Sequence, residues 1–192
     1  MRTSSIERKT LETEININLN LDGMGITNID TGIGFLDHML TLFGFHGKFD
    51  LDIKCIGDLN SDTHHTAEDI GISLGQAFIK ALGDKKGIER YGFMYLPMDE
   101  TLSRVVVDLG GRPYLIYNLK FNRSQIGTMA TEDFKEFFIG FANNCLCNLH
   151  VDLLYGENDH HKIESVFKGF GRAMKKAVQV TSDSLQSTKG AL

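Results

Sequence analysis

The sequence predicts an α/β protein of the α+β type, built from two similar halves, each with about four strands and two helices on one face of the sheet. A short phrase, His-His-x-x-Glu, occurs at residues 64–68 and again at 160–164. The predicted strands and helices follow the same order in both halves, and in each half the last of them is the long helix that carries the phrase. The two long segments that carry the phrase also match at the same offset in Gly75 and Gly171, Ala77 and Ala173, Lys80 and Lys176, and Ala81 and Ala177.

Two side-chain periods define the elements of the first half. Alternating polar and apolar residues predict strands, whereas apolar residues three and four apart predict helices that pack one face on the sheet. The turn Asp22-Gly23 separates the first two strands, and Asp62 or Thr63 is placed to cap the long helix. In chain order this predicts strands at 12–21 and 26–30, a helix at 35–43, a strand at 49–56 and a helix at 63–82.

The second half repeats that order after a junction at residues 83–90, which carry charges and two glycines. It predicts strands at 102–109 and 114–119, a helix at 134–141 from spaced phenylalanines, a strand at 149–155 and a helix at 159–180. We therefore expect repeat halves at 1–88 and 89–180 within one compact unit. The polar tail, 181–192, is predicted to be flexible or to dock.

Composition narrows the class of protein. Hydrophobic residues make up 42% and charged residues 23%, as in ordinary globular proteins, and the formal charge of -5 argues against a nucleic-acid surface. No apolar run is long enough to span a membrane, and residues 1–10 lack the apolar core of a secretion signal. Cys55, Cys145 and Cys147 show no zinc-ribbon spacing, so we expect reduced, buried thiols in a cytoplasmic protein.

The repeated phrase predicts metal binding. His64 and Glu68 lie four residues apart and share a helix face, whereas His65 points about 100° further round and would reach a different ion. If the two copies face each other, each could lend its off-face histidine to the other. One site would then hold His64, Glu68 and His161, and the other His160, Glu164 and His65. Such nitrogen-rich ligands favour zinc, iron or manganese.

Four longer motifs carry a specific resemblance. They are Gly-Phe-Leu-Asp-His-Met-Leu at 34–40, Asp-Thr-His-His-Thr-Ala-Glu-Asp at 62–69, Gly-Arg-Pro-Tyr at 111–114 and Asn-Asp-His-His-Lys-Ile-Glu at 158–164. Together they resemble the imidazoleglycerol-phosphate dehydratase family of histidine biosynthesis, over essentially the whole chain. The resemblance implies a lyase that dehydrates D-erythro-imidazole-glycerol phosphate to imidazole-acetol phosphate.

The resemblance also implies two manganese ions per active site. One ion would take His38, His65, His160 and Glu164. The other would take His64, Glu68, His161 and Glu136, a position where many members of the family have histidine. A carboxylate can also bind manganese, so we expect a working site. In the family chemistry the ions act as Lewis acids and as a template, holding an imidazolate that pushes electrons toward the leaving hydroxyl.

Further roles follow from the resemblance. Glu12, His46 and His65 would be catalytic, with Glu12 shuttling a proton. The substrate would contact Glu12, His38, His46, Arg90, Asp99, Arg112, Lys168, Ser187, Thr188 and Lys189. Lys168 lies one turn beyond Glu164, which independently points it toward the metal site. Members of the family assemble into a shell of 24 subunits, with active sites completed between subunits.

Two other functions remain open from the residues alone. A binuclear metallohydrolase would use two metals and water to cleave an ester or a phosphate. A non-enzymatic assembly module would use the ions only to join subunits, with closed coordination shells. Taken singly, Glu12 would be a solvated strand residue, His46 a loop histidine, Asp99 a charge at a strand edge, and the basic residues surface charges.

Overall fold

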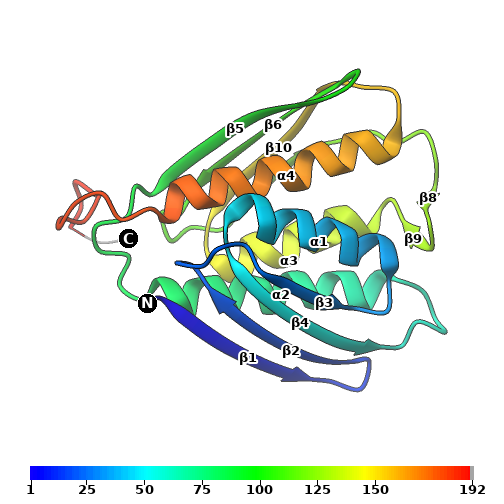
Figure 1. Cartoon of the computed structure of the whole chain (residues 1–192), viewed down its shortest axis with the longest axis horizontal. Coiled ribbons are helices and arrows are strands. Elements are labelled where there is room, and N and C mark those ends of the chain that lie inside the picture. Colours follow the sequence, from blue (N-terminus) through cyan, green and yellow to red (C-terminus); the bar gives the residue numbers. More distant parts are fainter. Residues whose placement is uncertain (191–192) are drawn as a thin grey trace.

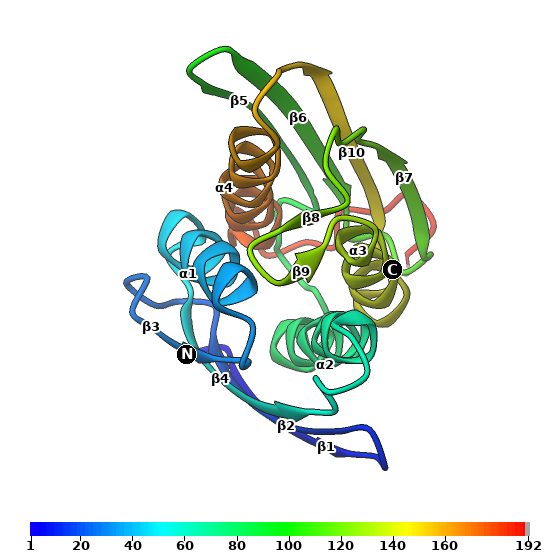
Figure 2. The same ribbon diagram turned by 90° about the vertical axis from the view of Figure 1, so that its right-hand side faces the viewer.

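Two four-stranded sheets enclose a layer of helices in this computed structural model, which describes residues 1–190 (Figures 1 and 2). The first half contains β1 (Thr3–Lys9), β2 (Thr13–Asn20), β3 (Thr27–Asp30), α1 (Gly34–Gly47), β4 (Asp50–Gly57) and α2 (His64–Leu82). The second contains β5 (Tyr91–Met98), β6 (Thr101–Asp108), β7 (Tyr114–Asn118), β8 (Gln125–Ile126), β9 (Met129–Ala130), α3 (Asp133–Cys145), β10 (Asn148–Tyr155) and α4 (Asp159–Val178).

The two sheets have the same topology. Their strand orders are β1-β2-β4-β3 and β5-β6-β10-β7, with the last pair parallel in each sheet and the other pairs antiparallel. In each half the two helices cover the inner face of the sheet, as Figure 2 shows. The predicted α+β class, with duplicated halves and helices on one face of each sheet, is confirmed. The boundaries 1–88 and 89–180 stay a prediction.

The helices pack across the halves, α1 against α4 and α2 against α3. Two glycines that correspond in the repeat permit the close approach. A Cβ on Gly171 would lie 2.4 Å from the carbonyl oxygen of Phe43, and one on Gly75 would lie 2.6 Å from that of Phe141. Both distances are too short for a Cβ atom, so the same steric requirement explains why glycine occupies both matched positions.

One phenylalanine from each helix joins the layer together. The ring of Phe170 in α4 lies 4.6 Å from Phe43 in α1 and 4.9 Å from Phe141 in α3. The ring of Phe78 in α2 lies 5.8 Å from Phe43 and 5.6 Å from Phe141, so the four rings contact one another in a cycle. All four side chains are fully buried, and aromatic pairs at these separations stabilise beyond the area they bury. This core fixes the helices that carry the histidines.

The sequence pattern did not predict one edge strand in each sheet, β1 and β5. In β1 alternate side chains are half-buried and mostly polar, so the period-two contrast is weak. In β5 the aromatic residues Tyr91, Phe93 and Tyr95 face outward and are exposed, and Pro97 is tolerated because the strand lies at an edge. The short pair β8 and β9 was also missed, and α4 ends at Val178 rather than at residue 180.

No helix within residues 1–190 has the length and hydropathy needed to cross a membrane. Residues 191 and 192 of the predicted tail lie outside the described residues.

Candidate metal centre

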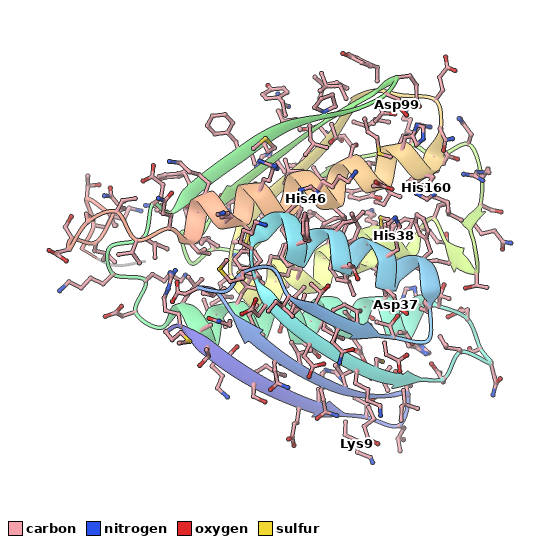
Figure 3. The ribbon with its side chains drawn as sticks, viewed as in Figure 1. Lys9, Asp37, His38, His46, Asp99 and His160 are labelled. Atoms are coloured by element: carbon pink, nitrogen blue, oxygen red, sulfur yellow. The ribbon has the colours of Figure 1, made fainter. Side chains whose placement is uncertain are left out.

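His38, His160 and Glu164 form a compact cluster between α1 and α4 (Figure 3). Their ligand atoms all lie within 4.8 Å of one another, and this is the one such group of three within residues 1–190. Nε2 of His160 lies 2.8 Å from Oε2 of Glu164, and Nε2 of His38 lies 3.3 Å from the same oxygen. Two imidazole nitrogens and a carboxylate oxygen match the ligand preference of manganese, zinc or iron.

Local structure orients this cluster. The side chain of Asn158 caps α4 by accepting the backbone N–H of His160, as expected for asparagine at an N-cap. On the next turn, Nζ of Lys168 lies 2.6 Å from Oε1 of Glu164. Burial raises the pKa of Glu164, but the hydrogen bonds from Lys168 and His160 outweigh it and hold that pKa below its ordinary value. Glu164 is therefore a carboxylate at neutral pH.

The first copy of the phrase is built in a similar way. Asp62 accepts the backbone N–H of His64, two residues on, as Asn158 does for His160. Nε2 of His64 lies 3.8 Å from Oε2 of Glu68, and its Nδ1 lies 3.6 Å from Oδ1 of the buried Asp133 in α3. Of the two predicted cap residues, Thr63 is the N-cap and makes no side-chain cap bond, whereas the side chain of Asp62, one residue earlier, accepts the His64 N–H.

Helix register brings Glu136 toward this pair. A Cβ on Gly140, one turn after Glu136 on the same face of α3, would lie 2.7 Å from the backbone oxygen of Glu68. Gly75 of α2 packs against Phe141 of α3, and Gly171 of α4 packs against Phe43 of α1, so the two helix pairs have the same register. Glu136 precedes Phe141 by as many residues as His38 precedes Phe43. In this register Glu136 therefore corresponds, beside α2, to His38 beside α4. Glu136 makes no hydrogen bond to His64 or Glu68 among the contacts of the described residues.

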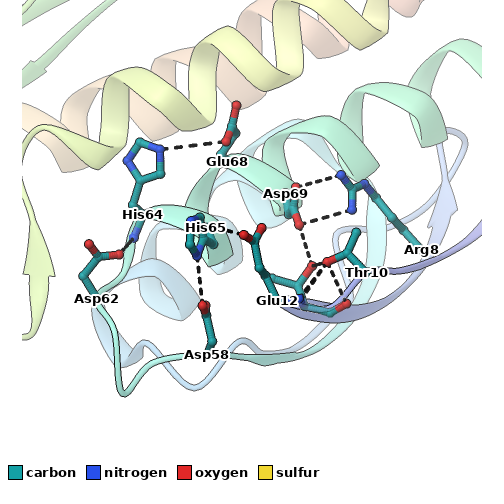
Figure 4. A network of polar contacts seen from close by, with 10 residues as sticks. Arg8, Thr10, Glu12, Asp58, Asp62, His64, His65, Glu68 and Asp69 are labelled. Carbon is teal, nitrogen blue, oxygen red and sulfur yellow. Dashed lines mark hydrogen bonds and ion pairs between the residues drawn. The ribbon is translucent and has the colours of Figure 1, made fainter.

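His65, the off-face histidine of the first copy, contacts two carboxylates (Figure 4). Nδ1 of His65 lies 2.9 Å from Oδ2 of Asp58, and its Nε2 lies 3.6 Å from Oε1 of Glu12. The hydrogen bond to Asp58, with the charge of Glu12, raises the pKa of His65 despite an opposing effect of desolvation. His65 therefore does not join the cluster of His38 within one chain.

His161 is held by the hairpin between β5 and β6. Its Nδ1 lies 2.8 Å from Oε2 of Glu100, and its Nε2 lies 3.9 Å from the exposed Asp99. The His161 hydrogen bond, supported by backbone N–H groups of Asn158 and Glu157, holds the pKa of Glu100 far below its ordinary value. Figure 3 shows Asp99 at the tip of this hairpin.

His46 lies at the other end of α1 from His38 (Figure 3). It lines a groove of about 460 Å³ with Lys48, Arg172, Lys175 and further residues of α4. Burial, together with the charges of Arg172, Lys168 and Lys48, lowers the pKa of His46. The imidazole is therefore neutral at physiological pH, with a free lone pair that can accept a proton.

The tail meets Arg90 at the start of the second half. The guanidinium of Arg90 pairs with Asp108 at 2.6 Å and donates to the backbone oxygen of Gln186 at 2.8 Å. Ser187 and Thr188 line a pocket of about 380 Å³ with Arg90, and the Ser187 hydroxyl accepts the Lys189 backbone N–H. The exposed Arg112 lies in the β6–β7 turn, where its backbone oxygen accepts from Asn148.

One chain thus gathers part of each predicted ligand set. It joins His38 with His160 and Glu164, and His64 with Glu68, whereas His65 and His161 face other groups. Residue patterns did not single out three carboxylates that contact the histidines, namely Asp58, Glu100 and Asp133. Asp58 carries a weak signal in the sequence, since it directly follows a strand shortly before the first His-His pair. Asp133 carries none, because its pairing with His64 depends on a helix from the other half.

Comparisons with known proteins agree with this architecture. Residues 31–174 match the family model described as imidazoleglycerol-phosphate dehydratase. Proteins of that name from Clostridioides difficile and Chromobacterium violaceum are 58% and 53% identical, over 100% of this chain and 100% and 99% of theirs. The crystal structure of the Staphylococcus aureus enzyme has a TM-score of 0.85 and 45% identity, covering 93% of this chain and 99% of that one. A structure of the Pyrococcus furiosus enzyme in complex with (S)-C348 has a TM-score of 0.84 and 37% identity, covering 97% and 100%. The chain therefore belongs to the imidazoleglycerol-phosphate dehydratase family, hydro-lyases of histidine biosynthesis.

Proposed function

We propose that this chain dehydrates D-erythro-imidazole-glycerol phosphate to imidazole-acetol phosphate with two manganese ions per active site. The observation that carries the proposal is the cluster of His38, His160 and Glu164, whose ligand atoms lie within 4.8 Å of one another in a member of this family. Two imidazoles and a carboxylate are a donor set suited to manganese. A third imidazole from another copy of the chain would complete the set.

The two ligand sets combine residues from different copies. One ion would be held by His38, His160 and Glu164 with His65 of another copy. The other would be held by His64, Glu68 and Glu136 with His161 of another copy. The separation of His65 and His161 from these clusters within one chain supports shared sites, and hence a large homo-oligomer, for which we propose 24 subunits.

Cationic and hydroxyl groups would bind the phosphate. Arg90 lies beside Ser187 and Thr188 in one pocket, where a planar guanidinium and hydroxyl donors suit phosphate oxygens. Lys168 contributes a charge next to Glu164 on the metal side. Arg112 and Lys189 complete the proposed phosphate contacts. His46 and Asp99 are proposed to contact the substrate from α1 and from the β5–β6 hairpin.

The reaction breaks the C–O bond beside the imidazole ring, whose hydroxyl leaves as water, and a C–H bond on the next carbon. The enol that results becomes the ketone when a proton is added to the carbon beside the ring and the enol hydroxyl loses its proton. When bound, the two ions would supply Lewis-acid stabilisation and orient the substrate imidazole. The carboxylate of Glu12 lies 3.6 Å from Nε2 of His65, so it is proposed to take and return a proton at that edge of the site.

Turnover by the assembled protein, freed of metal and reloaded with manganese, tests the proposal. We expect imidazole-acetol phosphate to form only with the metal present. No product from correctly assembled, manganese-loaded protein would reject the function. Release of phosphate from simple phosphoesters would instead favour a metallohydrolase. A metal spectrum that stays unchanged when an imidazole or triazole is added would favour an assembly module with closed coordination shells.

A further inference from the structure

The two off-face histidines share one contact, a carboxylate on Nδ1. Asp58 lies 2.9 Å from Nδ1 of His65, and Glu100 lies 2.8 Å from Nδ1 of His161. A carboxylate in that position accepts a hydrogen bond from Nδ1–H. The lone pair of the neutral ring is then on Nε2, the atom available to a metal.

Different parts of the repeat supply the two carboxylates. Asp58 follows β4, whereas Glu100 lies in the β5–β6 hairpin, which corresponds to the β1–β2 hairpin of the first half. In the first half that hairpin carries Glu12, which approaches the opposite ring atom, Nε2 of His65. The same Nδ1 contact is therefore built twice by elements that do not correspond. Inheritance from a common half does not explain this, but a requirement for the contact does.

Contacts other than those to the histidines hold both acidic residues in place. Oε1 of Glu100 accepts backbone N–H groups of Glu157 and Asn158 at 3.1 and 2.8 Å and the Thr101 hydroxyl at 3.0 Å, which leaves Oε2 for His161. Asp58 is held through its backbone, whose N–H donates to the Glu12 oxygen at 3.0 Å and whose oxygen accepts from Ser61 at 2.8 Å.

The side chain of Asp58 has few other partners. Oδ1 is buried and makes no hydrogen bond within the described part of the chain, so the one side-chain partner that Asp58 shows there is His65. A buried oxygen without a hydrogen bond costs stability, which a purely structural carboxylate would not need to bear.

We propose that Asp58 and Glu100 are positioning residues that select the Nδ1–H tautomer of His65 and His161 and direct Nε2 toward the metal ions. This inference rests on the proposed function, in which both histidines are ligands. Outer carboxylates of this kind fix ring orientation and raise ligand basicity, and their loss costs about 10- to 100-fold in metal affinity.

The test measures manganese affinity rather than activity. Metal-free wild type, Asp58→Ala, Asp58→Asn and Glu100→Ala are titrated with manganese while the free ion is followed by electron paramagnetic resonance. We expect about 10- to 100-fold weaker binding at one of two sites for Asp58→Ala and Glu100→Ala. Asp58→Asn should lose less, because its amide oxygen can still accept a hydrogen bond from Nδ1–H. Glu14→Gln is the matched control, since it removes an exposed carboxylate that pairs with Lys9 and contacts neither histidine within the described residues.

The outcomes separate the two proposals. Unchanged affinity in Asp58→Ala and Glu100→Ala, with two manganese ions bound and full turnover in the wild type, would overturn the positioning role and leave the function standing. An equal loss in Glu14→Gln would also overturn it, because the effect would be one of overall charge. A wild type that binds no manganese would reject both. Thermal unfolding of the metal-free variants checks the fold, and Glu100→Ala decides if Asp58→Ala does not fold.

Discussion

The guanidinium of Arg8 lies 2.9 Å from the carboxylate of Asp69, which joins the first strand of the chain to the helix that carries His64 and His65 (Figure 4). The Asp69 side chain is 8% exposed and also accepts the hydroxyl proton of Thr13 at 2.5 Å. The buried Asp69 carboxylate is tolerated because Arg8 supplies a countercharge and Thr13 a hydrogen bond. The pair therefore secures the hairpin that carries Glu12 against α2.

Removing one partner should be costly. We expect Arg8→Ala to lower the free energy of unfolding by about 3 kcal/mol, because it leaves the Asp69 carboxylate buried without its countercharge. Denaturant unfolding of metal-free protein measures the change. Lys9→Ala provides the comparison, since the Lys9–Glu14 pair is exposed, and its loss should cost less than about 1 kcal/mol. Equal effects of the two changes would contradict the role given to Asp69.

The helix contacts across the halves predict a second pair of variants. Gly171→Ala would force a methyl group to within 2.4 Å of the Phe43 carbonyl oxygen and should destabilise by about 2 kcal/mol or more. Gly34→Ala has open space around the added methyl and should change stability by less than about 0.5 kcal/mol. Thermal or denaturant unfolding distinguishes them, and a tolerated Gly171→Ala would show that α1 and α4 can separate at little cost.

Asp50 predicts a pH dependence of stability. Its Oδ1 accepts the backbone N–H groups of Met24, Gly25 and Ile26 at 2.8 to 3.1 Å, and these bonds, that of Ile26 first, lower the pKa of Asp50. A lowered folded pKa stabilises above the unfolded value of about 4, and that stability is lost as pH falls through the folded pKa. Asp50→Asn should therefore be less stable than wild type at pH 7, with the difference shrinking in acid. A difference that is constant with pH would contradict this account.

Two substitutions test the ligand assignment. We expect His65→Ala to abolish turnover of imidazole glycerol phosphate without unfolding the chain, because the His65 side chain is partly exposed and its ion pairs within residues 1–190 are those with Glu12 and Asp58. Glu136→His should keep activity, since an imidazole nitrogen can bind manganese in place of a carboxylate oxygen. Steady-state kinetics with manganese measures both, and full activity of His65→Ala would mean that His65 is not a ligand.

Periodicity in the sequence predicted the elements whose two faces differ most. The Ile15, Ile17 and Leu19 alternation of β2 and the phenylalanines of α3 are buried as expected, because burial selects apolar residues at those spacings. Edge strand β1 was missed because neither of its faces is fully covered. The pairing of α1 with α4 could not be predicted, because an apolar period shows which face of a helix is buried but not which helix packs on it.

The same limit applies to the site. Helical geometry correctly predicted that His64 and His65 point in different directions, because the backbone fixes a turn of about 100° per residue. The carboxylates that contact these rings come from loops and from the other half. Asp133 meets His64 through the α2–α3 packing, and Glu100 meets His161 through a hairpin. Only the tertiary fold brings such distant residues together, so their pairing was not encoded in any local spacing.

The exchange of helix partners has a consequence for the origin of the fold. Because α1 packs on α4 and α2 on α3, each long helix makes its closest backbone contact with the short helix of the other half. A protein made of one half could therefore complete its core only as a two-fold symmetric dimer, with each copy covering the long helix of the other. Gene fusion would have made that dimer a single chain. Once joined, the halves could diverge, so that histidine stands at position 38 and glutamate at 136.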